Sequence, residues 1–109
     1  MKWYTDLYLG KSIARRYRML QYKISHRLIH PTVYLIALVQ REGRLLEIIP
    51  STCLLQPVYP QENLYILGMA GSRQEAVNLT CEILEAVFKE RGNFDLRAWL
   101  YPFAKEGSL

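Results

Sequence analysis

The stretch from Leu64 to Gly92 constrains the fold most, because the pattern of a buried strand runs directly into the pattern of a capped helix. The first part, "LYILGMA" at 64–70, is almost wholly apolar and reads as a strand. Ser72 and Glu75 then form an S-x-x-E capping box, and Gly92 stands where a C-terminal cap is expected. The helical positions that share one face are Ala76, Thr80, Ile83, Leu84, Val87 and Phe88. The chain should therefore contain a sheet with a helix packed against it.

The remaining sequence predicts a second helix and three further strands. Lys2–Leu9 alternates loosely and carries strand-favouring aromatic residues. A helix is expected over Ile13–Ile29, and Pro31 ends it because the residue before a proline is pushed out of helical geometry. Thr32–Pro50 is typical of a β-hairpin with a polar turn, and Ser51 is a candidate N-cap for a short helical turn that follows. The apolar positions on one face of the first helix are Ile13, Tyr17, Leu20, Ile24 and Leu28.

Two segments of similar sequence, "DLYLGKS" at 6–12 and "NLYILGMAGS" at 63–72, each indicate a strand, a glycine turn and the start of a helix. Such units predict that both helices lie on one face of a sheet. The order β-α-β-β-β-α therefore indicates an α+β fold, a two-layer sandwich of two helices on a small mixed sheet. A small doubly wound α/β sheet is the alternative. We expect one domain over residues 1–104, with the aromatic tail covering the core, and a frayed tail at 105–109.

The composition is that of an ordinary globular domain, since half of the 109 residues are hydrophobic and 22% are charged. No apolar run approaches the roughly 18–20 residues that span a bilayer, which predicts that the chain has no transmembrane segment. Asp6 and Gly10 interrupt any signal-peptide core, so a cytoplasmic location is expected. Cys53 and Cys81 do not form a CxxC pair, and we expect them to be buried free thiols.

The positive charge is concentrated in the first thirty residues. The net charge of the chain is +4, but residues 1–30 contain seven basic residues and one acidic residue, while the remainder is net negative. A polyanion could bind these cations, with Tyr22 stacking on a base. An acidic protein surface or anionic lipid is an alternative partner, and a solvated face with ion pairs to Glu47 or the second helix is a further interpretation. The candidate polyanion-binding residues are Lys11, Arg15, Arg16, Arg18, Tyr22, Lys23 and Arg27.

The strand–helix corner at 68–73 is a candidate anion or small-ligand site, because a helix N-terminus presents backbone N–H groups and the positive end of its dipole. Its candidate residues are Gly68, Gly71, Ser72 and Arg73. The segment "GMAGS" matches neither a P-loop nor a dinucleotide-binding fingerprint, and the capping box uses some of the same N–H groups. Two glycines at a tight corner also have a purely steric explanation.

Metal binding and catalysis have weaker support in the sequence. His26 and His30 stand four residues apart at a helix end, a spacing that can chelate a metal, but no third ligand accompanies them. Ser51 and Cys53 are potential nucleophiles that no spacing connects to a base, and Glu47 is a carboxylate inside a strand pattern. We therefore predict no catalytic residue, metal or cofactor.

The sequence is best interpreted as a small non-enzymatic binding or regulatory protein. Its first predicted mode of action is contact with an unidentified protein partner or self-association, including a homodimer. The alternative is nucleic-acid binding through the basic first helix. A second alternative is phosphate or small-ligand binding at the N-terminus of the second helix, over Gly68–Ser72.

Overall fold

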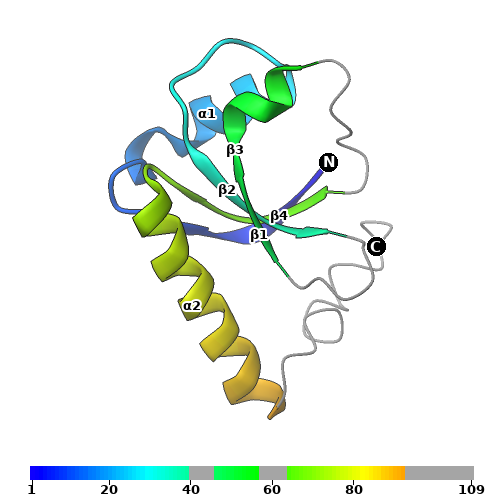
Figure 1. Cartoon of the computed structure of the whole chain (residues 1–109), viewed down its shortest axis with the longest axis vertical. Coiled ribbons are helices and arrows are strands. Elements are labelled where there is room, and N and C mark those ends of the chain that lie inside the picture. The colour runs from blue at the N-terminus through cyan, green and yellow to red at the C-terminus, as the bar shows by residue number, and fades with distance from the viewer. Residues whose placement is uncertain (40–45, 57–63, 93–109) are drawn as a thin grey trace.

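The computed structural model describes residues 1–39, 46–56 and 64–92. The predicted turn of the hairpin and the aromatic tail lie outside these residues. Figure 1 shows the elements, which in chain order are β1 (Lys2–Leu9), the 3₁₀ helix η1 (Ala14–Arg16), α1 (Tyr17–Ser25), β2 (Tyr34–Val39), β3 (Glu47–Pro50), the 3₁₀ helix η2 (Ser51–Leu55), β4 (Leu64–Ala70) and α2 (Arg73–Arg91).

The four strands form one mixed sheet in the order β1-β4-β2-β3. β1 runs parallel to β4, whereas β2 is antiparallel to both β4 and β3. All seven residues of β4 are buried, because the strand lies inside the sheet and both of its faces are covered. The α+β class, the small mixed sheet with two helices packed on it, and the order β-α-β-β-β-α are confirmed.

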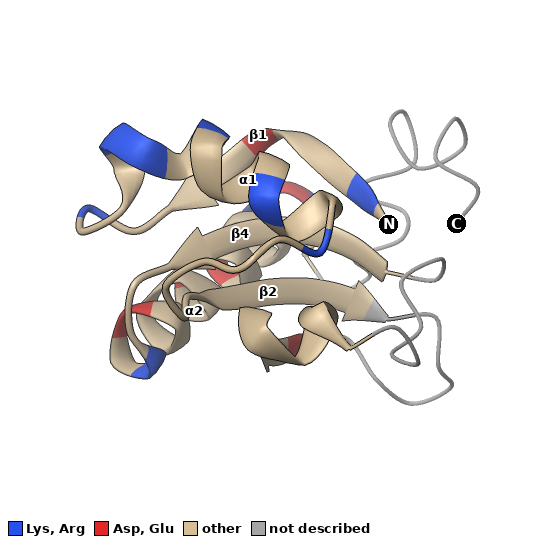
Figure 2. Ribbon diagram, turned by 90° about the horizontal axis from the view of Figure 1, so that it is seen from above, with Lys and Arg blue, Asp and Glu red and all other residues tan. Residues whose placement is uncertain are grey.

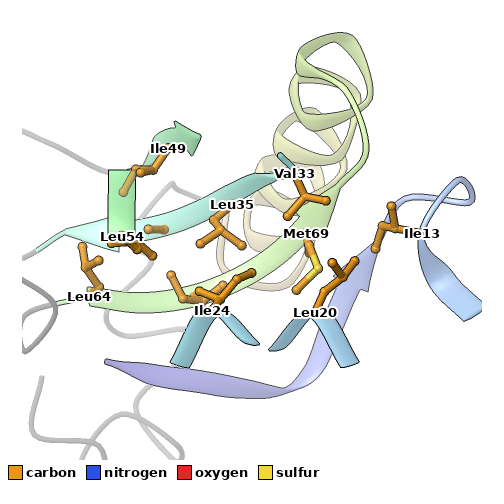
Figure 3. Close-up of a cluster of buried hydrophobic side chains, with 11 residues drawn as sticks. Ile13, Leu20, Ile24, Val33, Leu35, Ile49, Leu54, Leu64 and Met69 are labelled. Atoms are coloured by element: carbon orange, nitrogen blue, oxygen red, sulfur yellow. The ribbon is translucent and has the colours of Figure 1, made fainter. Parts of the chain in front are cut away.

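The two helices cover opposite faces of the sheet, so the prediction that both lie on one face is wrong. Along β2, Ile36 and Leu38 belong to the apolar cluster that α2 covers, whereas Leu35 and Ala37 belong to the cluster that α1 covers. Figure 1 shows α1 and α2 on the two sides of the strands, and Figure 3 shows the cluster under α1. The physical reason is that β2 and β4 are apolar at successive positions, so each face needs its own cover.

Helix α2 follows its sequence signals closely. The Ser72 Oγ accepts a 3.1 Å hydrogen bond from the Glu75 backbone N–H at the N-terminus, and Gly92 closes the C-terminus in the left-handed conformation with φ 71°. The buried residues of the helix are Ala76, Leu79, Ile83 and Val87. Phe88 was predicted to lie on the buried face of this helix, but it is 51% exposed. The buried face of α2 is therefore displaced toward Leu79.

Helix α1 is shorter than predicted and ends before Pro31 is reached. It spans nine residues after the 3₁₀ turn η1, in place of a continuous helix over 13–29. At its end, the Leu28 N–H bonds the Lys23 carbonyl at 2.8 Å and the Arg27 N–H bonds the Ile24 carbonyl at 3.2 Å, which is a Schellman motif. Arg27 takes the left-handed position of that motif with φ 54°, where glycine is usual. Leu28 was predicted to lie on the apolar face of this helix, but it follows the end of the helix and is exposed.

Candidate functional site

Four cations lie exposed on the turn and short helices that follow β1. Lys11 precedes η1, Arg15 and Arg16 lie in η1, and Arg18 is in the first turn of α1. We call these four residues the basic segment. Figure 2 shows Lys and Arg gathered along η1 and α1, across the sheet from α2. The sequence contains no acidic residue between Leu7 and Val39, and the carboxylates that the fold brings to Lys11 are Glu75 and Glu82, which line a cavity with it.

The cations at the N-terminus of α1 are placed where they destabilise this helix. The first turn of α1 has no acidic residue, its N-cap is Arg16, and no side chain caps the N-terminus. Cations at a helix N-terminus oppose the helix dipole, typically by about 0.3–1 kcal/mol each. The sequence predicted one continuous α-helix over Ile13–Ile29, and the 3₁₀ turn at Ala14–Arg16 breaks its periodicity.

Arg18 is oriented by its neighbour Tyr17. Its Nε–H donates to the Tyr17 hydroxyl at 3.2 Å, and its guanidinium lies 5.8 Å from the centre of the Tyr17 ring. The hydrogen bond with Tyr17 raises the pKa of Arg18 above its ordinary value, so the guanidinium remains charged.

A cleft of about 400 Å³ opens between β1 and the start of α1, next to Arg18. Its lining residues are Trp3, Tyr4, Thr5, Leu7, Tyr17, Arg18 and Gln21. The Trp3 Nε1–H donates to the Ser25 Oγ at 3.2 Å and ties β1 to the end of α1. This cleft was not predicted from the sequence. The aromatic residues of β1 were its one signal, and they were interpreted as strand formers.

The remaining members of the predicted polyanion-binding set have different surroundings. Tyr22 is 59% exposed, but its ring lies 4.3 Å from the ring of His26. Lys23 is half-buried. The Arg27 guanidinium donates to the backbone carbonyls of Leu54, at 3.0 Å, and Gln56, and so ties the end of α1 to η2.

The predicted anion-binding corner is engaged by the chain itself. Gly68 is buried in β4, where a Cβ atom would approach the Tyr8 carbonyl to 2.8 Å. The Gly71 N–H donates to Glu75 Oε1 at 2.7 Å, and the Ser72 Oγ caps α2. The guanidinium of Arg73 lies 5.6 Å from the centre of the Tyr34 ring. An external anion would have to displace the carboxylate of Glu75.

Glu75 joins the two strand–helix corners of similar sequence. Its carboxylate accepts hydrogen bonds from the Ser12 hydroxyl at 2.7 Å and from the Ser12 N–H at 3.4 Å, in addition to the Gly71 N–H. The Gly71 N–H, followed by the Ser12 hydroxyl, lowers the pKa of Glu75 below its ordinary value. The capping box places Glu75 near Gly71, but the sequence does not indicate that Ser12 would meet it.

His30 and Ser51 form a buried pair that spacing did not reveal. The His30 Nδ1 bonds the Leu28 carbonyl at 2.8 Å, so Nδ1 carries the proton and Nε2 accepts from the Ser51 hydroxyl, also at 2.8 Å. The Ser51 Oγ in turn accepts a hydrogen bond from the Val33 N–H at 2.9 Å.

The prediction that Ser51 is an N-cap is wrong, because its side chain makes these bonds and Pro50 precedes η2 as its cap residue. Ser51 is 0% exposed, so a substrate could not reach this pair.

The other reactive side chains lie apart. Cys53 and Cys81 are free thiols as predicted, but they are half-buried and exposed respectively, because Cys81 lies outside the buried stripe of α2. His26 is exposed, whereas both ring nitrogens of His30 are engaged by protein atoms. Over residues 1–39, 46–56 and 64–92, no group of three or more His, Cys, Asp and Glu side chains is arranged to hold a metal ion.

In the same ranges, no helix is both long enough and apolar enough to span a bilayer. Comparison of the chain with protein-family models, with curated proteins and with solved structures finds no match. The function therefore has to be inferred from the side chains themselves, and the basic segment with its adjoining cleft is one feature that could receive a partner.

Proposed function

We propose that this protein is a small binding or regulatory protein that acts by non-covalent contact with an acidic protein partner, through the side of the sheet that α1 covers. The observation that carries the proposal is the basic segment, four exposed cations of which Arg15, Arg16 and Arg18 lie at the uncapped N-terminus of α1. Since the helix dipole disfavours cations there, it does not account for Arg15, Arg16 and Arg18.

A protein partner is favoured over a nucleic acid by what lies beside the basic segment. The cleft next to Arg18 is walled by aliphatic and aromatic side chains as well as polar ones, which suits protein side chains. Tyr22, the residue expected to stack on a base, already lies against the His26 ring. Nucleic-acid binding through the basic segment remains the alternative, because four exposed cations also attract phosphates.

The proposal is tested by reversing charge on the two sides of the sheet. The variant Arg15→Glu with Arg16→Glu changes the basic segment, and Lys89→Glu with Arg91→Glu makes the same charge change in the last turn of α2 as a matched control. Binding of a fluorescent polyglutamate peptide is measured by anisotropy at low salt. We expect the first double variant to lose at least about tenfold in affinity and the control to lose little.

Two results would contradict the proposal. Equal losses in the two double variants would show that net charge alone attracts the peptide. Tighter binding of a single-stranded DNA of equal charge, with a steep salt dependence, would favour the nucleic-acid alternative. Light scattering across a range of protein concentrations tests the remaining form of the hypothesis, in which the partner is a second copy of the chain.

A further inference from the structure

We infer that the cleft between β1 and α1 is an anchor site for one apolar side chain of an acidic peptide segment, with a neighbouring carboxylate of that segment held by Arg18. This inference rests on the proposed function and adds the chemistry of the partner. It assigns a binding role to Trp3, Leu7, Tyr17 and Gln21, none of which belongs to the basic segment.

The cleft has a definite structural cause in β1. Trp3 of β1 pairs with Ile66 of β4, and Tyr8 of β1 pairs with Gly68 of β4. Between these two pairs, β1 has four residues whereas β4 has only one. The intervening residues of β1 bulge out of regular register with β4. A bulge bends its strand and redirects side chains, and bulges are common beside binding sites. Here the bulged residues Tyr4, Thr5 and Leu7 form one wall of the cleft.

The apolar part of the cleft is continuous with the core. Trp3, Leu7 and Tyr17 are half-buried and pack against the buried cluster that includes Leu20 and Ile24. Their outer surfaces remain partly exposed to solvent beside the cleft. An apolar side chain placed there would remove this surface from water and rest against a wall that packing already holds in place.

The polar part of the cleft determines which apolar segment fits. Gln21 provides an amide, and Arg18 provides a charged guanidinium that the Tyr17 hydroxyl orients. A guanidinium is suited to a carboxylate, and the remaining cations of the basic segment continue the positive surface along η1. The volume of about 400 Å³ lies at the small end of the range for ligand pockets, about 300–1,000 Å³. The site therefore fits a Leu or Phe that is flanked by Asp or Glu.

The test compares two peptides of equal length and charge, one alternating Glu with Leu and one alternating Glu with Gly. The variant Thr5→Phe fills the cleft from an exposed strand position, and Thr32→Phe makes the same change at an exposed position before β2 as the matched control. We expect the Glu–Leu peptide to bind the native protein at least about tenfold more tightly than the Glu–Gly peptide. Thr5→Phe should abolish that difference, and Thr32→Phe should preserve it. Gln21→Phe fills the same cleft from α1 if Thr5→Phe fails to fold.

The fluorescence of Trp3 provides an independent readout. The chain contains two tryptophans, so a Trp99→Phe background leaves Trp3 as the sole one. Its emission should shift to the blue when the Glu–Leu peptide binds and should not shift with the Glu–Gly peptide, because the Leu side chain excludes water from the indole ring.

The possible results separate this inference from the proposed function. Equal binding of the two peptides, or a Thr5→Phe variant that keeps the preference for Glu–Leu, would overturn the anchor site while leaving the basic surface intact. A failure of both peptides to bind would overturn both. Single-stranded DNA that binds more tightly than both peptides and quenches Trp3 would replace both with a base-stacking site.

Discussion

The Ser12 hydroxyl donates a 2.7 Å hydrogen bond to the carboxylate of Glu75, 63 residues further along the chain. The same carboxylate accepts the Gly71 N–H at 2.7 Å. The turn after β1 and the turn after β4 are therefore joined by one side chain at the end of the parallel strand pair. Glu75 acts as an internal anion at the N-terminus of α2, the place where an external anion was predicted to bind.

The Glu75 contact predicts a specific dependence of stability on pH. Because folding lowers the pKa of Glu75, its stabilising contribution is complete above the ordinary carboxyl pKa of 4.5 and is lost as the pH falls through the folded pKa. Glu75→Gln should reduce the free energy of unfolding by about 1 kcal/mol at neutral pH, and this difference should shrink as the pH is lowered through the range in which carboxyl groups protonate. Urea unfolding across this range checks the prediction, with Glu85→Gln on the exposed face of α2 as the control. A constant difference between native protein and Glu75→Gln at all pH values would contradict it.

Gly10 predicts a coupling with Glu75 that can be measured in a double-mutant cycle. A Cβ atom at Gly10 would clash with the Oε1, Cδ and Cγ atoms of the Glu75 side chain. Gly10→Ala should therefore destabilise the native protein by about 1–3 kcal/mol, because the side chain must move and lose its hydrogen bonds. In a Glu75→Ala background the same substitution should cost much less, since the clashing atoms are gone. Additive effects in chemical denaturation would show that the crowding lies elsewhere.

Comparison of α2 with α1 shows why the sequence predicted some features and not others. The signals of α2 are local: Ser72, Glu75 and Gly92 act within one turn of the helix ends, and all three take the expected places. The end of α1 depends on Arg27, whose left-handed conformation is accompanied by hydrogen bonds to the Leu54 and Gln56 carbonyls. No local pattern reveals those partners, so the helix was predicted to continue to Ile29.

The candidate site shows the same division between local and tertiary information. The exposure of Lys11, Arg15, Arg16 and Arg18 follows from their residue type, whereas the 3₁₀ turn at Ala14–Arg16 was not predicted. The cleft depends on where β1 leaves its register with β4, which is a tertiary property. The placement of the two helices on opposite faces likewise depends on sheet order, which spacing along the chain does not determine.

The buried pair of His30 and Ser51 predicts a large loss of stability when the hydroxyl is removed. In Ser51→Ala, the His30 Nε2 and the Val33 N–H would both lose their partner in a buried site. Each unsatisfied buried polar group costs about 1–3 kcal/mol, so we expect a loss of about 2–6 kcal/mol in urea denaturation. Thr52→Ala, one residue further along η2, is the control and should cost less. A Ser51→Ala variant as stable as the control would show that water satisfies both groups.

Arg27 predicts an order of stability among three substitutions. Arg27→Ala removes the hydrogen bonds to the Leu54 and Gln56 carbonyls and keeps a Cβ atom at φ 54°, so it should be the least stable variant. Arg27→Gly loses the same bonds but accepts the left-handed conformation, and should be about 1 kcal/mol more stable than Arg27→Ala. Arg27→Lys keeps a positively charged donor but lacks the planar guanidinium group, so its stability should lie between those of the native protein and Arg27→Ala. Thermal and urea unfolding measure the order, and equal stability of the Ala and Gly variants would contradict the left-handed assignment.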